Sequence, residues 1–209
     1  MEEFGEAAHR VEVPDRAIGK WRGKLPERLL SFWKDEGWSG YSDGLFWTVD
    51  PDDYEDLVDE WLDGTPLEQV DAFHAIARTA FGELFLFGES TGRSLKIAPL
   101  VNSIFIRNLT RKKPDQLDLS LRAFFGLDKA TCDLQDESGK PLFARALSRL
   151  GAVEPDEMYA FEPALIAGGK MVIDGLAKVK LDQHLTILRQ LSPPTFPFCK
   201  DLNELISKL

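Results

Sequence analysis

A strongly acidic segment, residues 35 to 63, limits how this chain can fold. It holds eleven Asp or Glu and no Lys or Arg, so its formal charge of −11 exceeds the −10 of the whole 209-residue chain. Three Trp, two Tyr and one Phe lie among these acids. The segment must keep its carboxylates in solvent while it buries rings, which requires an amphipathic element at the surface of a core.

Residues 51 to 63 are predicted to form that element as a helix. Asp50 fits the N-cap, Pro51 fits the first helical position, and Gly64 fits the end. At 100° per residue, an apolar stripe falls on one side and a row of carboxylates falls almost opposite. The stripe consists of Tyr54, Leu57, Val58 and Trp61. The row consists of Asp52, Asp56, Asp59 and Asp63, flanked by Asp53 and Glu60.

Helix stability does not explain this row, because like charges four residues apart cost about 0.2–0.5 kcal/mol per pair. A solvated face of an acidic protein is one explanation, and a binding partner is another. The remainder of the chain sums to only +1, which favours a local role for the acids. The Gly/Ser-rich stretch 37 to 44 adds Trp38, Tyr41 and Asp43 on an expected loop, as in interface hot spots.

We therefore predict that the six acids and these three residues bind a basic protein. Such a partner would offer Lys and Arg that normally contact phosphates, as in the cleft of a nuclease. Four further aromatic rings, in the segment and just before it, are expected in the core. They are Trp33, Phe46, Trp47 and Trp61.

Composition indicates a folded chain and excludes several partners. Apolar residues make up 44% and charged residues 29%, close to globular averages. A pI near 4.8 argues against nonspecific nucleic-acid binding and against anionic membranes. The N-terminus does not read as a signal peptide, and no apolar run is long enough to span a bilayer. Cys132 and Cys199 fit neither a zinc site nor a disulfide framework, so we expect a cytoplasmic protein with free thiols.

The order of predicted elements favours an α+β fold with mixed helices and antiparallel strands. Helices are expected at 26–37, 51–63, 65–82, 117–125, 141–150, 174–191 and near the C-terminus. Strands are expected at 44–50, 82–88, on both sides of Pro99, and at 158–165. The polar, basic stretch 107–116 marks a boundary between a domain at 1–110 and a domain at 115–209. The two either fold separately or pack as one body.

No motif indicates catalysis or a metal centre. The sequence lacks HExxH, GxSxG and CxxC. His74 and His184 fall on apolar helical faces and are expected at the edge of the core. The acidic run 50–55 lacks the Gly of a calcium loop, and GGK at 168–170 lacks the spacing of a phosphate loop. We therefore predict no catalytic residue, no metal and no cofactor.

Two parts of the sequence resemble a known family. LPERLLSFWKDEGWSGYSDGLFWTVDPDDYEDLVDEWL (25–62) and FGELFLFGESTGRSLKIAPLVNSIFI (81–106) resemble the GAD-like domain of bacterial immunity proteins. MYAFEPALIAGGKMVIDGLAKVKLDQHLTILRQL (158–191) resembles the C-terminal domain of the same proteins. Its family pattern is a Tyr-x-Phe-x-Pro-Ala-Leu strand, a Gly-Gly turn and a KVKLDQHL helix.

The resemblance implies a type VI secretion immunity protein that neutralises a toxin injected by neighbouring cells. Relatives with this layout are paired with DNase effectors, and the family supplies no catalytic residues to transfer. Two alternatives stay open at this point. One is an enzyme that acts on the toxin or its product, and the other is a regulatory interaction protein that reuses the fold.

Overall fold

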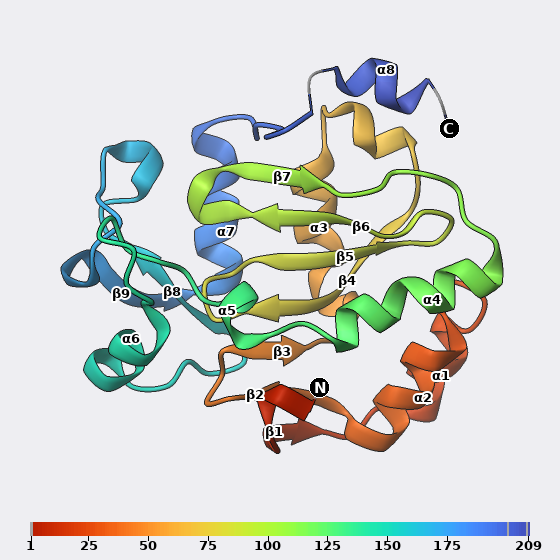
Figure 1. Cartoon of the computed structure of the whole chain (residues 1–209), viewed down its shortest axis with the longest axis horizontal. Coiled ribbons are helices and arrows are strands. Elements are labelled where there is room, and N and C mark those ends of the chain that lie inside the picture. Colours follow the sequence, from red (N-terminus) through yellow and green to blue (C-terminus); the bar gives the residue numbers. More distant parts are fainter. Residues whose placement is uncertain (1, 200, 208) are drawn as a thin grey trace.

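The computed structural model describes residues 2–199, 201–207 and 209. In that part of the chain, seven antiparallel strands form one sheet in sequence order (Figure 1). They are β1 (Ala7–Val11), β2 (Trp38–Tyr41), β3 (Phe46–Thr48), β4 (Phe73–Thr79), β5 (Leu84–Gly88), β6 (Gly92–Ala98) and β7 (Ser103–Ile106). A second, antiparallel pair joins β8 (Glu157–Phe161) to β9 (Leu176–Lys180). The α+β prediction is confirmed.

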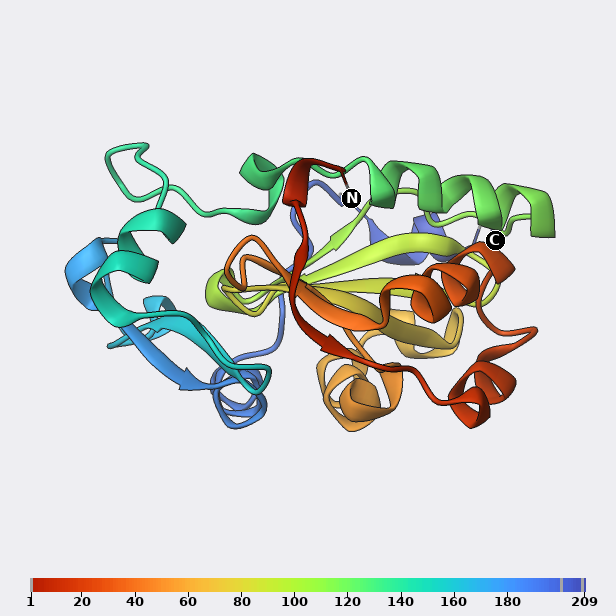
Figure 2. The ribbon, with the colours of Figure 1, turned by 90° about the horizontal axis from the view of Figure 1, so that it is seen from below.

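Helices cover both faces of the large sheet (Figure 2). On one face, α2 (Glu27–Glu36) packs against α4 (Pro114–Phe125), which lies over β6. On the other face, α3 (Glu55–Leu62) lies against β4 and contacts α7 (Leu181–Leu191). The remaining helices are α1 (Asp15–Trp21), α5 (Lys129–Cys132), α6 (Phe143–Leu150) and α8 (Leu202–Ile206). No helix within the described residues is long and apolar enough to cross a bilayer.

Short 3-10 helices connect many of these elements. They are η1 (Glu2–Phe4), η2 (Pro51–Tyr54), η3 (Pro66–Gln69), η4 (Pro99–Val101), η5 (Leu165–Ala167) and η6 (Ile173–Gly175). The predicted helix 51–63 is therefore η2 followed by α3, and the Asp50 carboxylate accepts a hydrogen bond from the N–H of Asp52 as its cap. The predicted strands around Pro99 are β6 and β7, separated by η4.

Three expectations about secondary structure are wrong. Residues 65–82 are not a helix but η3 followed by β4, and every residue of β4 is buried. A strand covered on both faces loses the alternation that identifies a strand, and its two Ala residues have high helix propensity. The first part of the predicted helix 174–191 is the end of η6 followed by β9, which pairs with β8. The predicted loop 37–44 contains β2.

The N-terminal sheet and the C-terminal part are joined around Arg78 of β4. Its side chain is fully buried, and its guanidinium carbon lies 4.7 Å from the centre of the Trp47 ring. The guanidinium donates to the carbonyl oxygens of Glu154 at 3.2 Å and Pro155 at 2.7 Å. One core therefore runs through both parts of the chain, which pack as one body.

Two further backbone connections hold the parts together. The N–H of Tyr159 in β8 donates to the carbonyl oxygen of Ala80 at 2.8 Å. At the outer edge of the sheet, the N–H of Ile104 in β7 donates to the carbonyl oxygen of Thr195 at 2.8 Å. The Pro-rich stretch after α7 thus returns to pair with β7. The predicted boundary stretch 107–116 covers the segment between β7 and α4 and the first residues of α4.

We expect Arg78→Met to lower the free energy of unfolding by about 3 kcal/mol. Met occupies a similar volume but leaves the carbonyl groups of Glu154 and Pro155 without their donor. Urea denaturation measures the change. The control is Arg16→Met on the exposed face of α1, which should stay within about 0.5 kcal/mol of the wild type. Equal stability of both variants would show that Arg78 does not hold the two parts together.

Asp50 generates a second prediction because its half-buried carboxylate caps η2. Burial raises the pKa of Asp50 from 3.8 to about 6, and the charges of Asp52 and Asp53 add to the effect. The folded state therefore binds this proton more tightly than the unfolded state does. Its contribution to stability is present at low pH and is lost as the pH rises from about 4 to about 6.

Asp50→Asn should remove this pH dependence, because Asn keeps the capping oxygen but does not ionise. We expect the variant to exceed the wild type in free energy of unfolding by about 1 kcal/mol at pH 7.5, since solvent screens a half-buried charge. The advantage should shrink as the pH falls to 4.5. Denaturation curves of both proteins at the two pH values measure the difference. Parallel pH profiles would contradict the assignment.

Candidate functional site

The acidic row lies on the solvent face of η2 and α3, as the helical projection predicts. Asp52, Asp53, Asp56, Asp59 and Asp63 are exposed, and Glu60 is half-buried. The opposite stripe is buried in the core. Its members Tyr54, Leu57, Val58 and Trp61 are all less than 9% exposed. The predicted core rings Trp33, Phe46 and Trp47 are buried as well.

Two of the six acids are engaged within the protein. The carboxylate of Asp52 accepts from the Lys20 ammonium of α1 at 2.6 Å. Glu60 accepts from the Thr186 hydroxyl of α7 at 2.7 Å. Within the described residues, the carboxylates of the other four acids have no ion pair. These are Asp53, Asp56, Asp59 and Asp63, and they make up what we call the free acidic row.

A hollow of about 560 Å³ lies beside α3 and is bordered by acids from two segments. Its lining contains six carboxylates and no Lys or Arg. They belong to Glu55, Asp59, Glu60, Asp63, Glu68 and Asp71. Sequence reasoning missed Glu55, Glu68 and Asp71, because the helix it placed at 65–82 hid the turn that brings two of them to α3. No three His, Cys, Asp or Glu side chains among the described residues have a geometry that could hold a metal ion.

The three predicted loop anchors lie elsewhere and differ in exposure. Trp38 is half-buried, with its ring centre 5.9 Å from that of Trp33, and Asp43 is exposed in the turn after β2. Tyr41 is only 2% exposed, and burial raises the pKa of its hydroxyl to about 12. The expectation that this stretch leaves its rings in solvent is therefore wrong for Tyr41. Because β2 pairs with β1 and β3 while α3 packs on β4, the anchors and the acidic row lie at different parts of the sheet.

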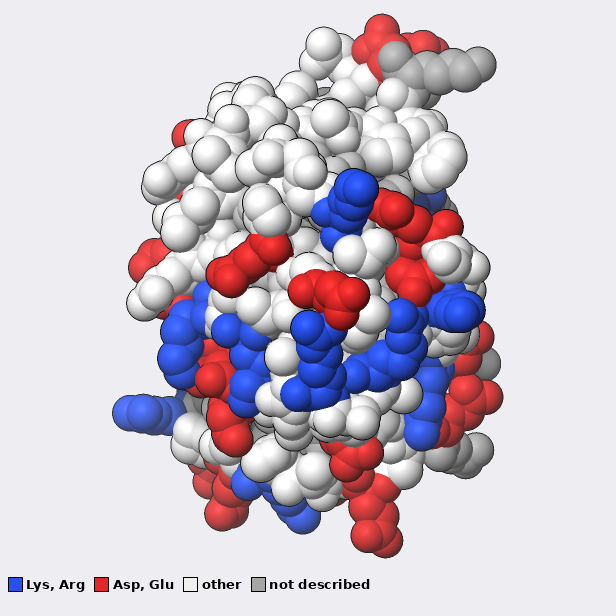
Figure 3. All heavy atoms as spheres, turned by 90° about the vertical axis from the view of Figure 1, so that its left-hand side faces the viewer, with Lys and Arg blue, Asp and Glu red and all other residues white. Residues whose placement is uncertain are grey.

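An exposed apolar patch lies on α7, which contacts α3, and on two short helices. It is formed on η4, η5 and α7, which are linked by contacts of η4 with both other elements. Figure 3 views the side of the molecule that carries β8, β9 and α6, and the upper part of this side carries few charged side chains. The patch residues are Val101, Ile166, Ile187 and Leu191, with exposed fractions of 45%, 40%, 53% and 55%. We call these four residues the apolar patch.

Helix α7 connects the apolar patch to the acidic row. In addition to the Thr186 contact, Arg189 donates from Nη2 to the carbonyl oxygen of Asp63 at 2.7 Å. Ile187 and Leu191 stand on the same helix. Helices α3 and α7 are in contact, and we call their exposed sides, with the carboxylates on α3 and the apolar side chains on α7, the composite surface. A surface of this mixed kind suits a protein partner better than a small molecule.

His74 and His184 are two of the three His residues of the chain, and His74 borders the acidic hollow. His74 is 8% exposed in β4, and its Nε2 lies 3.0 Å from a carboxylate oxygen of Glu89. His184 is half-buried on α7, and burial lowers its pKa. Both lie at the edge of the core, as predicted. Cys132 and Cys199 are free thiols, and burial raises the pKa of Cys132 to about 12.

Comparisons with known proteins assign both halves of the chain. The model of the GAD-like domain matches residues 1–101, and the model of the C-terminal domain of the T6SS immunity protein Tdi1 matches residues 118–192. The crystal structure of Atu4351 from Agrobacterium tumefaciens has a TM-score of 0.84 and 25% sequence identity, covering 97% of this chain and 92% of that one. No curated protein matches the sequence. The chain thus combines a GAD-like domain with the C-terminal domain of the type VI secretion immunity protein Tdi1, the architecture that the sequence resemblance indicated.

Proposed function

We propose that this protein is a cytoplasmic immunity protein that binds one cognate toxin through the composite surface of α3 and α7. The toxin is a basic protein, a nuclease of the DNase class, and the bound immunity protein occludes its active-site cleft. The family match supports the immunity role. The acidic surface is the reason for proposing that the toxin is a basic protein.

The observation that carries this proposal is the free acidic row. Within the described residues, these four carboxylates, spread over about three helical turns, have no ion pair, although the chain contains 25 Lys and Arg. Unpaired like charges slightly destabilise a helix, so a complementary field on a partner would offset a cost that the isolated protein bears. A nuclease cleft, which holds Lys and Arg for phosphates, supplies such a field.

The apolar patch would add affinity that charged side chains alone do not provide. Exposed ion pairs contribute little to affinity, because salt screens them and water competes for them. Affinity in protein complexes comes mainly from a desolvated cluster of larger side chains with polar groups around it. Ile187 and Leu191 would provide such a cluster beside the carboxylates, so that the acids speed association and the apolar side chains slow dissociation.

The predicted anchors on β2 have a smaller part in this proposal. Trp38 and Asp43 present surface that a large toxin could contact at the periphery of the complex. Tyr41 is buried and would act only by holding β2 in place. Asp52 and Glu60, which bond to Lys20 and Thr186, would add charge to the field without being free to rearrange.

The product of the gene next to this one should co-purify with this protein when the two are expressed together. Binding without catalysis predicts inhibition that is complete at one equivalent of immunity protein per toxin. Titrating toxin activity against added immunity protein measures the ratio. Complete inhibition well below one equivalent would indicate an enzyme that modifies the toxin, and the inhibitor proposal would fail.

Reversing charges in the free acidic row should slow association. We expect Asp56→Lys with Asp59→Lys to reduce the on-rate for the toxin about tenfold or more at low salt, with the fold intact. The wild-type on-rate should itself fall as ionic strength rises from about 0.01 to 0.15 M, because the screening length drops from about 30 to 8 Å. Surface plasmon resonance at several salt concentrations measures both effects.

The matched control is Glu3→Lys with Glu6→Lys. These two acids are exposed, make the same change in charge, and lie on the N-terminal segment near α4, across the sheet from α3 (Figure 2). The control should retain most of the wild-type on-rate. If both double variants slow association equally, net charge rather than the free acidic row governs the encounter.

A further inference from the structure

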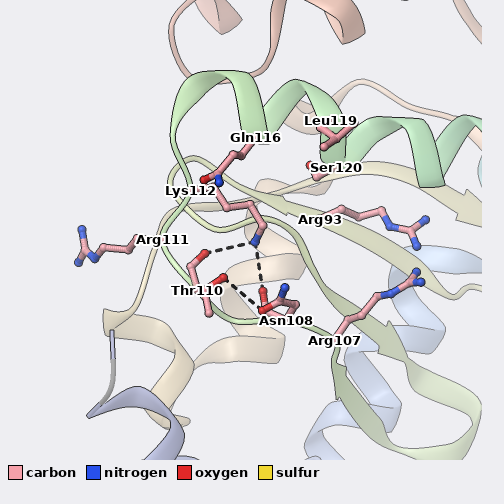
Figure 4. A pocket seen from close by; sticks show the side chains of 9 residues that line it. All are labelled: Arg93, Arg107, Asn108, Thr110, Arg111, Lys112, Gln116, Leu119 and Ser120. Carbon is pink, nitrogen blue, oxygen red and sulfur yellow. Dashed lines mark hydrogen bonds between the residues drawn. The ribbon is translucent and has the colours of Figure 1, made fainter.

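A cationic hollow of about 460 Å³ lies between β6, the segment after β7 and the start of α4 (Figure 4). Its lining includes four Lys or Arg side chains and no carboxylate, in a chain with 35 acidic and 25 basic residues. The cations are Arg93, Arg107, Arg111 and Lys112, with Gln116 and Ser120 on the side of α4. The local balance of charge is thus the reverse of that of the whole protein.

Arg93 and Arg107 form a pair of like charges in this hollow. The N–H of Arg107 donates to the carbonyl oxygen of Ser94 at 2.9 Å, which holds the two residues next to each other. Their guanidinium groups extend to the same side, whereas the side chain of Arg111 points away (Figure 4). Burial and the charge of Arg107 lower the pKa of Arg93 to about 10. Two adjacent guanidinium groups without an anion repel each other.

Arg93 also carries an unused hydrogen-bond donor. Its Nη1 is buried and has no hydrogen-bond partner within the described residues. A buried donor without a partner costs about 1–3 kcal/mol. By contrast, several Lys and Arg side chains of the C-terminal part lie in ion pairs, such as Arg149 with Asp174 and Lys180 with Asp156. The donor of Arg93 is available for a ligand.

The other charges near the hollow do not neutralise this pair. The Lys112 ammonium donates to the backbone carbonyl oxygens of Thr91, Asn108 and Thr110, which carry no formal charge. Arg107 borders a neighbouring hollow together with Asp201 and Glu204 of the C-terminal segment. No ion pair joins Asp201 to Arg107 in the part of the chain that the structure describes.

An apolar hollow of about 310 Å³ adjoins the cationic one and shares Arg93 and Arg107 with it. Phe85, Phe105 and Leu127 are among the side chains that line it. The guanidinium carbon of Arg93 lies 6.0 Å from the centre of the Phe85 ring. The pair of arginines therefore stands at the junction of a charged and an apolar space, and each space is within the usual size of small-molecule sites, about 300–1,000 Å³.

We propose that Arg93 and Arg107 bind the phosphate group of a small organic phosphate, whose apolar or aromatic part occupies the hollow lined by Phe85 and Phe105. A phosphate monoester carries a charge of about −1.5 to −2 at pH 7, which balances two guanidinium groups. Its oxygens also accept the paired hydrogen bonds that guanidinium groups donate. A nucleic acid fits less well, because a net charge of −10 repels a polyanion.

This proposal does not depend on the toxin-binding proposal. The hollow lies on the α4 side of the large sheet, since the Phe85 ring contacts Phe124 of α4 at 6.3 Å between centres. Helix α3 covers the opposite side (Figure 2). The protein could therefore hold the small phosphate and the toxin at the same time.

Isothermal titration calorimetry of the full chain with phenyl phosphate, inorganic phosphate and phenol tests the proposal. Phenyl phosphate should bind at least tenfold more tightly than inorganic phosphate, and phenol should not bind measurably. Arg93→Gln and Arg107→Gln should each weaken the binding of phenyl phosphate at least tenfold. Arg111→Gln is the matched control, since it removes the same charge from a side chain that points away, and it should change binding less than twofold.

Several outcomes would overturn the proposal. If phenyl phosphate does not bind at millimolar concentration, the hollow is not a phosphate site. Equal affinities for phenyl phosphate and inorganic phosphate would show that the apolar hollow does not bind the organic part of the ligand. Equal losses in the Arg93, Arg107 and Arg111 variants would indicate a diffuse charge effect. If Arg93→Gln does not fold, the exposed Arg107 gives the same test, and circular dichroism checks the fold of each variant.

Discussion

The buried guanidinium of Arg78 is the constraint on which the arrangement of this protein depends. A fully buried charge requires hydrogen-bond acceptors, and Arg78 finds them in carbonyl groups 76 and 77 residues further along the chain. Stacking on Trp47 fixes the other side of the group. The segment before β8 is thereby held against β4, and the contact of the Phe81 and Tyr159 rings, 5.9 Å between centres, continues the core across the junction.

That junction also determines the outer surface. Because β8 is fixed against the end of β4, the strand β9 that pairs with it delivers α7 to the side of α3. The composite surface therefore belongs to neither half of the chain alone: the carboxylates come from the GAD-like part, and the apolar side chains Ile187 and Leu191 come from the Tdi1-type part. A toxin that binds there would recognise the assembled protein. The cationic hollow on the α4 side is separate from this surface and leaves room for a second ligand.

The sequence predicted those elements whose pattern is local. Helix α3 with its cap at Asp50, its apolar stripe and its acidic row follows from residue spacing, because an amphipathic helix shows its buried face in the sequence. Strand β4 was missed, since burial on both faces removes the alternation that would identify it. The start of β9 was taken for a helix because its partner β8 lies 15 or more residues earlier, and pairing over that distance leaves no local signal.

The candidate surface was predictable only in part for the same reason. The carboxylates could be assigned to solvent from the helical projection, whereas the burial of Tyr41 depends on β2 joining a sheet. The apolar patch arises from three segments that meet only in the folded protein. Arg93 stands on β6 and Arg107 follows directly after β7. Their lack of carboxylate ion pairs within the described residues is a property of the three-dimensional arrangement rather than of their sequence context.

Carboxylate footprinting of the complex tests directly whether the toxin binds over the free acidic row. Carbodiimide labelling, read by mass spectrometry, reports the accessibility of each Asp and Glu in the free protein and in the complex with its toxin. We expect toxin binding to reduce labelling of Asp53, Asp56, Asp59 and Asp63 and to leave labelling of Glu3 and Glu6 unchanged. If the four acids on η2 and α3 are labelled equally in both states while acids elsewhere are protected, the toxin binds another face and the account is wrong.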